Sequence, residues 1–138
     1  MANVIDMQKM RYLNLFEKIT RISTRFCFVY NETIVFCVPK SLVFKAIGEN
    51  GRNIKKLNEI LRKKIKVVPK PRGIVDLKSF IGSIVSPVNF KSLDLKGNEV
   101  VLTAGIQSKA ALIGREKRRL LEMQKIIKDF FGREYKII

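Results

Sequence analysis

The residues best suited to chemistry in this sequence form two short stretches that run directly into basic helices. The first is Gly48-Glu49-Asn50-Gly51, followed by Arg52, and the second is Gly114-Arg115-Glu116-Lys117, followed by Arg118. Glycine lets an anion approach the main chain closely and permits a tight turn between helices. The amides at the start of a helix carry the positive end of its dipole and bind phosphate. Both stretches therefore indicate phosphate binding.

Side chains for catalysis are scarce. The sequence has no histidine, so the usual general base, any histidine-based triad and any histidine ligand for zinc are missing. Cys27 and Cys37 are the only thiols, and they lie in apolar, strand-like sequence without metal-ligand spacing. We expect a protein that is not an enzyme, with no metal, no cofactor and no small-molecule substrate.

The charge of the chain points to an anionic partner. The 138 residues include 28 Lys and Arg against 12 Asp and Glu, a net charge of +16, and 46% are apolar, enough for a core. A folded basic protein attracts nucleic acid first and an anionic membrane surface second. No apolar run approaches the roughly 20 residues that span a bilayer, and Asp6, Lys9 and Arg11 interrupt any N-terminal signal. We expect a cytoplasmic protein with no membrane role.

An internal repeat places the two stretches at equivalent positions. A shift of 66 residues carries Gly48 onto Gly114, and it also superimposes the apolar helical positions that follow them. These positions are Ile54, Leu57, Ile60 and Leu61 in the first copy and Leu120, Met123, Ile126 and Ile127 in the second. The turns Asn31-Glu32 and Gly97-Asn98 also coincide, and both suit two-residue hairpins. The chain is thus predicted to fold as two similar units.

Each unit is predicted to run helix, strand, turn, strand, helix, short loop, helix, strand. The first has expected helices at 4–22, 41–47 and 52–63 and strands at 24–30, 33–38 and 64–69. The second has expected helices at 77–86, 107–113 and 118–131 and strands at 89–96, 99–104 and 134–138. Asn3, with Asp6 three residues later, and Asp76 are the expected helix caps, while Pro69, Pro71 and Gly73 mark the junction.

Strand alternation predicts which side chains share a face. In the second hairpin one face is apolar and the other is polar except for Val101. In the first hairpin the core face carries Cys27, Val29, Ile34, Phe36 and Val38, and the opposite face is apolar too, with Phe26, Phe28, Tyr30, Val35 and Cys37. The two cysteines therefore point apart and are expected to be reduced core thiols. The second apolar face needs a cover: the other unit or a chain segment, or alternatively a partner protein or stacked bases.

The segment Ile47-Gly48-Glu49-Asn50-Gly51-Arg52-Asn53-Ile54, downstream of a hairpin in a unit that recurs, resembles the KH domain. The GxxG loop of that domain clamps the backbone of about four nucleotides of single-stranded nucleic acid. The helix and strand that precede the β-α-α-β core resemble its type II arrangement. The resemblance implies an α+β, two-layer fold of two tandem type II KH domains, at 1–72 and 73–138. Each would be a three-stranded mixed sheet with three helices packed on it.

A chain that is little else than two such units resembles the archaeal NusA-like transcription termination/antitermination factor family, over residues 3–138. This implies single-stranded RNA and the RNA polymerase elongation complex as partners. The RNA-binding residues carried over are Ile47, Gly48, Glu49, Asn50, Gly51, Arg52 and Lys55 in the first unit and Gly114, Arg115, Lys117 and Arg118 in the second. Val43, Ala46 and Ile47 are expected to provide an apolar floor for bases.

Two departures from the pattern alter the expectation. Glu49 puts a negative charge into the first loop, and Lys117 replaces the last glycine of the second, which is therefore degenerate. We expect the first unit to hold RNA by backbone geometry and the second mostly by the charges of Arg115, Lys117, Arg118 and Arg119. The run Arg62-Lys63-Lys64 is either a solvated helix end or a track for phosphates.

Two other functions remain open from sequence. The chain could be a KH protein of ribosome assembly or of the small ribosomal subunit, since a fold does not choose its assembly. It could also be a protein-interaction adaptor that uses Phe26, Phe28 and Tyr30 as its partner surface, with incidental RNA binding.

Overall fold

The computed structural model describes residues 7–138, which divide into two compact units, one ending at Lys70 and the other comprising Pro71–Ile138. The elements of the first unit are α1 (Met7–Thr20), β1 (Phe26–Tyr30), β2 (Thr33–Val38), α2 (Val43–Ile47), α3 (Arg52–Leu61) and β3 (Lys64–Pro69). Single 3-10 turns, Lys40–Leu42 and Glu49–Gly51, precede α2 and α3. The caps expected at Asn3 and Asp6, and the start of the expected helix 4–22, lie outside the described residues.

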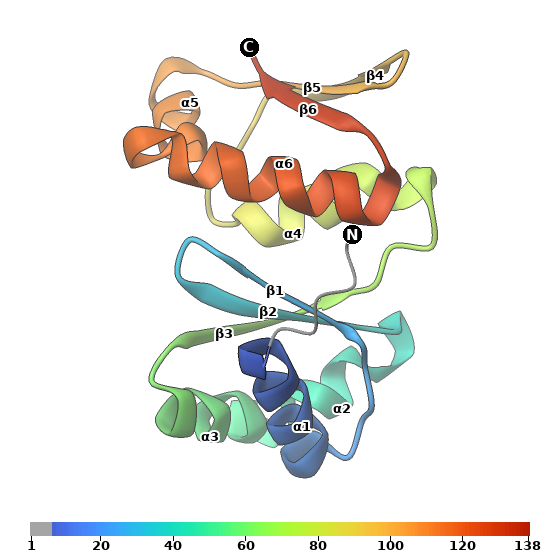
Figure 1. The fold of residues 1–138 in the computed structure, drawn as a ribbon, viewed down its shortest axis with the longest axis vertical. Helices are drawn as coiled ribbons and strands as arrows, with labels where there is room; N and C mark the ends of the chain where they lie inside the picture. Colours follow the sequence, from blue (N-terminus) through green and yellow to red (C-terminus); the bar gives the residue numbers. More distant parts are fainter. Residues whose placement is uncertain (1–6) are drawn as a thin grey trace. The chain divides into compact units, whose positions relative to one another are not determined.

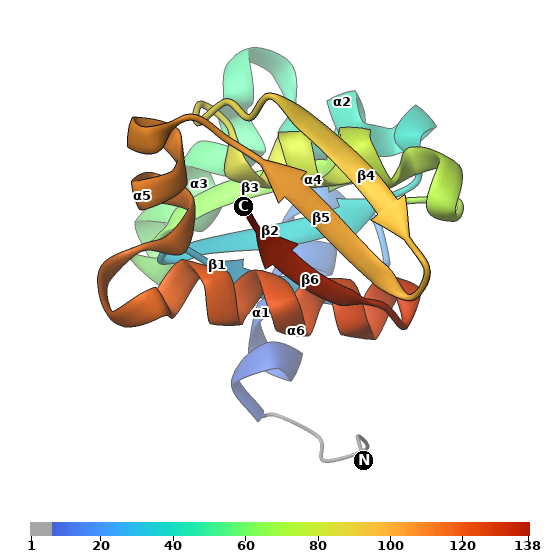
Figure 2. The ribbon, with the colours of Figure 1, turned by 90° about the horizontal axis from the view of Figure 1, so that it is seen from above.

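The second unit repeats this order. Its elements are α4 (Leu77–Val85), β4 (Ser92–Lys96), β5 (Glu99–Thr103), α5 (Ile106–Ile113), α6 (Arg118–Phe131) and β6 (Glu134–Ile137). Within each unit, three helices lie on one face of a three-stranded sheet (Figures 1 and 2). The predicted α+β class is thus confirmed for residues 7–138, with two three-stranded sheets and six α-helices.

Both sheets are mixed, and both hairpins have the predicted register. In the first sheet β2 is central, antiparallel to β1 and parallel to β3, and β5 has the same place in the second. Tyr30 pairs with Thr33 across the first turn, whose two residues both have positive φ, 51° and 59°. This is the type I′ geometry that matches the twist of a hairpin.

The core of the first unit lies between its helices and the predicted face of its sheet, although Val29, expected on that face, is exposed. The ring of Phe16 in α1 stacks on Phe36 in β2, with centroids 4.3 Å apart, and Cys27 belongs to the same cluster. Cys37 points to the other face, as expected, and the two buried cysteines do not form a disulfide. Burial raises the pKa of Cys37 from 9.0 to about 12.

The opposite face of this sheet is also largely shielded from solvent. Tyr30, Val35 and Cys37 are buried, while Phe26 and Phe28 have intermediate exposure. The ammonium of Lys70 lies 4.3 Å from the centroid of the Phe26 ring.

The helix after the second loop is longer than its counterpart by one turn. α3 has 10 residues and α6 has 14. Consequently Lys64 pairs with Thr33 in the first sheet, whereas Glu134, not residue 130, pairs with Glu99 in the second. The added turn carries Phe130 and Phe131, whose ring centroids lie 5.0 and 5.8 Å from that of Phe80 in α4.

Asp76 occupies the expected cap position of α4, but it does not cap the helix. Its carboxylate accepts hydrogen bonds from the backbone amide, Nε and Nη2 of Arg72, at 2.9 to 3.1 Å, and from no amide of α4. The expected cap is wrong in this respect, because the guanidinium supplies a charged partner four residues away. This ion pair keeps the pKa of Arg72 above its ordinary value.

No helix between residues 7 and 138 is long and apolar enough to cross a membrane.

Candidate nucleic-acid interface

The loop of the first unit is a tight turn between α2 and α3. Gly48 ends α2 with φ 83° and ψ 164°, and Asn50 and Gly51 follow in left-handed conformations, at φ 56° and 73°. The amide of Gly48 donates to the carbonyl of Phe44 at 3.0 Å, and the amide of Gly51 donates to the carbonyl of Gly48 at 3.1 Å. Two positive-φ glycines and an asparagine thus suit the shape of the turn.

The loop of the second unit has the same main-chain path. Gly114 has φ 76° and ψ 172°, and Glu116 and Lys117 have φ 56° and 62°. The hydrogen bonds are the same: Gly114 donates to Ala110 at 3.0 Å, and Lys117 donates to the carbonyl of Gly114 at 3.1 Å. The replacement of the last glycine by Lys117 therefore leaves the backbone unchanged, at a cost of about 1 to 2 kcal/mol for a left-handed L-residue.

The first glycine of each loop is required for space as well as for its dihedral angles. A Cβ on Gly48 would lie 3.0 Å from both the backbone nitrogen and Cγ of Asn53, and one on Gly114 would lie 2.9 Å from Cγ of Arg119. A Cβ on Gly51 would have no neighbour within 4 Å. This difference explains why glycine persists at 114 while lysine is accommodated at 117.

Asn53 and Arg119 brace the two loops at equivalent positions. Asn53 Nδ2 donates to the carbonyl of Lys45 at 3.3 Å, and Arg119 Nη1 donates to the carbonyl of Ala111 at 2.9 Å. Sequence reasoning missed the role of Asn53 and counted Arg119 among the phosphate-facing charges. The guanidinium of Arg119 is instead held against the main chain, and its side chain is half-buried. Their equivalent roles could have been predicted from their spacing, because each lies five residues after the first glycine of its loop.

The amides available to an anion are not those first expected. The amide of Arg52 donates to the carbonyl of Glu49, and that of Arg118 donates to Arg115, so the first helical amides are used within the loops. In the described chain no acceptor is found for the amides of Glu49 and Asn50, and both residues are exposed. Open main-chain donors thus include the amides of Glu49 and Asn50, inside the loop.

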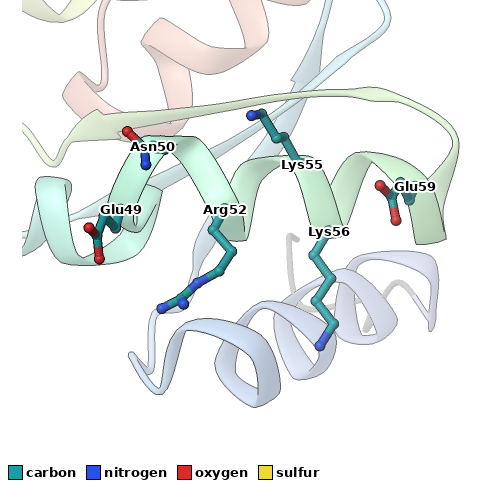
Figure 3. Close-up of a pocket in the computed structure, with 6 residues that line it drawn as sticks. All are labelled: Glu49, Asn50, Arg52, Lys55, Lys56 and Glu59. Atoms are coloured by element: carbon teal, nitrogen blue, oxygen red, sulfur yellow. The ribbon is translucent and has the colours of Figure 1, made fainter.

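The side chains predicted as RNA-binding lie at these loops and have the following exposures. Ile47, Gly48, Gly51 and Gly114 are intermediate, and Glu49, Asn50, Arg52, Lys55, Arg115, Lys117 and Arg118 are exposed. In the first unit a shallow surface hollow of about 500 Å³ is lined by Glu49, Asn50, Arg52, Lys55, Lys56 and Glu59. The side chains of Arg52 and Lys56 extend toward α1, and that of Lys55 extends the opposite way (Figure 3).

The cations of this hollow are not neutralised by ion pairs. The ion pairs Arg72–Asp76, Lys128–Glu134 and Lys136–Glu99 all lie in the second unit, and none of them uses a cation of this hollow. Arg52, Lys55 and Lys56 therefore keep their charges available to a ligand, although Glu49 and Glu59 line the same hollow. The run Arg62-Lys63-Lys64 lies at the other end of α3, away from the loop.

The expected apolar floor of Val43, Ala46 and Ile47 is wrong for Ala46, which faces the core. Ala46 is fully buried in the core cluster, and Val43 packs against it, while Ile47 is half-buried. α2 has only five residues, so its sequence did not reveal which side faces the sheet. The exposed side instead carries Phe44 and Lys45, with Phe44 86% exposed.

Comparison with curated proteins finds archaeal relatives, whereas no protein-family model matches the chain. A protein of Methanocaldococcus jannaschii named probable transcription termination protein NusA is 29% identical over 133 residues, which cover 93% of this chain and 71% of that protein. The protein of the same name from Methanococcus vannielii is 30% identical over 112 residues, 78% of this chain and 63% of that one. In Thermoplasma acidophilum the corresponding values are 26% over 137 residues, 96% and 90%.

A solved structure shares the whole fold. The crystal structure of APE1850 superimposes with a TM-score of 0.66 at 27% sequence identity, and the match covers 97% of this chain and 99% of that one. The arrangement of two mixed sheets and six helices is thus found in an experimental structure of similar length. The family resemblance that the loop and the repeat indicated is confirmed by the sequence relatives.

Proposed function

We propose that this chain, a relative of the archaeal NusA-like transcription termination proteins, binds single-stranded RNA through its two loops. In this proposal it acts in the cytoplasm with the RNA polymerase elongation complex, as an elongation, termination or antitermination factor. The two units, 1–72 and 73–138, are type II KH domains, and neither carries out catalysis.

The observation that carries the proposal is the repetition of one loop geometry with different side chains. The dihedral angles of Gly48, Asn50 and Gly51 recur within 11° at the equivalent positions of the second unit. Because the main-chain path of the loop is the same in both units although the side chains differ, we infer that the path itself serves the function. With the open amides of Glu49 and Asn50 inside it and unpaired cations beside it, this shape fits a phosphodiester backbone.

The two loops offer an anion different surroundings. In the first unit the main-chain amides are the close contacts, Arg52 and Lys55 supply charge from α3, and the exposed carboxylate of Glu49 must turn away from the phosphate. In the second unit Arg115 replaces that carboxylate, and with Lys117 and Arg118 it places three cations at the loop itself. Binding at the second loop should therefore depend more strongly on salt.

The test is a single charge placed inside the first loop. Asn50→Asp keeps the size of the side chain and a left-handed conformation that Asp tolerates. A negative charge about 4 Å from a phosphate costs about 1 kcal/mol even in water, so affinity for a short single-stranded RNA should fall at least about fivefold. Fluorescence anisotropy with a labelled oligonucleotide measures this.

Asn31→Asp is the matched control. It is the same substitution in the same unit, at a similar φ of 51°, but in the hairpin turn near Lys64, at the other end of α3. Its RNA affinity should stay close to that of the unmodified protein. Equal losses in both variants would mean that only net charge matters and that the loop is not the binding site.

A second measurement separates a clamp from general basic attraction. A plot of log affinity against log salt has a negative slope. Arg52→Gln should make that slope less steep by about 0.7, the value for one phosphate contact on a single strand, and Lys78→Gln should not change it. Single-stranded RNA should also bind more tightly than a duplex of equal length. Capture of RNA polymerase subunits after nuclease treatment tests the polymerase contact, whereas capture of ribosomal subunits alone would oppose it.

A further inference from the structure

Phe44 is the one aromatic side chain of the protein that lies open to solvent. All twelve Phe and Tyr residues fall within residues 7–138, and the other eleven are buried or intermediate. Phe44 is 86% exposed. A single exposed apolar side chain is ordinary on a protein surface, so its position decides whether it has a role.

The position of Phe44 is beside the first loop. Its carbonyl accepts the hydrogen bond from Gly48 that ends α2, which puts the ring one helical turn before the loop. Ala46 and Val43 take the inner side of this short helix, so Phe44 and Lys45 occupy the outer side. Lys40, four residues earlier, is also exposed, and neither lysine has an ion pair within the described chain.

An aromatic face next to cations and open amides matches the chemistry of a single-stranded nucleic acid. Such strands bind where charges hold the phosphates and aromatic rings stack on the bases, and each stacked base contributes about 1 to 3 kcal/mol. A duplex offers no free base face at this place. The equivalent residue of the second unit is Ala110, which is exposed but has no ring to stack.

We propose that Phe44 stacks on an unpaired base of the RNA whose backbone lies at loop 48–51. The inference rests on the proposed function, because it needs RNA at that loop. It assigns base contact, and thus selection of single strands, to the first unit. The second unit then contributes charge without an aromatic contact at this position.

The sequence contains no tryptophan, so Phe44→Trp places the only tryptophan at the site, where its emission can be excited apart from that of the three tyrosines. This variant is titrated with an eight-nucleotide RNA and with a ribose-phosphate oligomer of equal length that lacks bases. Anisotropy of a label on the oligomer measures binding, and tryptophan emission measures stacking. RNA should quench the emission and the abasic oligomer should not. Val75→Trp, 77% exposed in the second unit, is the control and should stay unquenched by either.

Truncation of Phe44 measures how much the ring contributes to RNA affinity. Phe44→Ala removes an exposed ring, so the fold should tolerate it, and affinity for RNA should fall by about 5-fold to 150-fold. The affinity for the abasic oligomer should not change.

The outcomes separate this inference from the function on which it rests. If RNA binds and the emission of Phe44→Trp is unaltered, or if Phe44→Ala binds RNA as tightly as the unmodified protein, stacking at Phe44 is wrong and RNA binding stands. An equal loss of affinity for RNA and abasic oligomer also rejects stacking. If the unmodified protein binds neither oligomer, both the inference and the proposed function fail.

Discussion

The two glycines of the first loop should respond very differently to a methyl group. Gly48→Ala and Gly51→Ala add the same atoms three residues apart, and both residues have positive φ, 83° and 73°. At Gly51 the new Cβ meets open space, so the cost is that of a left-handed L-residue, about 1 to 2 kcal/mol.

At Gly48 two costs combine. Its dihedral angles, φ 83° and ψ 164°, lie in a region that is essentially restricted to glycine, which costs about 1 to 3 kcal/mol. The new Cβ would also lie 3.0 Å from the backbone nitrogen of Asn53, and overpacking of this kind costs about 1 to 3 kcal/mol. Gly48→Ala should therefore lower the free energy of unfolding by at least about 1 kcal/mol more than Gly51→Ala.

Urea denaturation followed by circular dichroism measures the difference. With a slope of about 2 kcal/mol per molar urea, an extra 1 to 3 kcal/mol lowers the midpoint by about 0.5 to 1.5 M. Gly114→Ala should resemble Gly48→Ala, because its Cβ would lie 2.9 Å from Arg119. Equal midpoints for the Gly48 and Gly51 variants would refute the steric reasoning, and with it the explanation of Lys117.

Three other predictions follow from the same loops and core. Lys117→Gly should raise the free energy of unfolding by about 0.5 to 1 kcal/mol in urea denaturation, since it relieves a left-handed L-residue. Asn53→Ala should cost about 1 kcal/mol through its lost hydrogen bond and speed hydrogen exchange of the Gly48 amide, detected by NMR. The pKa of Cys37 is 9.0 in the unfolded chain and about 12 in the folded protein, so the free energy of unfolding should fall as the pH rises from 9 to 12. In Cys37→Ala this fall should be smaller.

The hairpins and the repeat were readable from sequence because they depend on local rules. Alternation along β1 and β2 fixes which side chains share a face, and Asn31 opens a turn that needs positive φ. The two cysteines could be assigned to opposite faces for the same reason. The loops were found because glycine recurs at 48 and 114 with the same helical pattern after it.

Features that depend on tertiary contacts were not readable. α2 is too short for its period to show that Ala46 faces inward and Phe44 outward. Arg119 looked like a free cation, but the carbonyl of Ala111 lies within its reach, and that proximity exists only after folding. The carboxylate of Asp76 likewise accepts hydrogen bonds from Arg72 and does not cap the helix that follows it.

The extra turn of α6 shows where a unit of this kind can change its length. Four residues add about 6 Å along a helix and return its side chains to nearly the same face, so the strand that follows still pairs in register. The addition lies at the end of the helix farthest from the loop, whose dihedral angles are the same in both units. The length of this helix can therefore vary, through evolution or design, without altering the loop at its start.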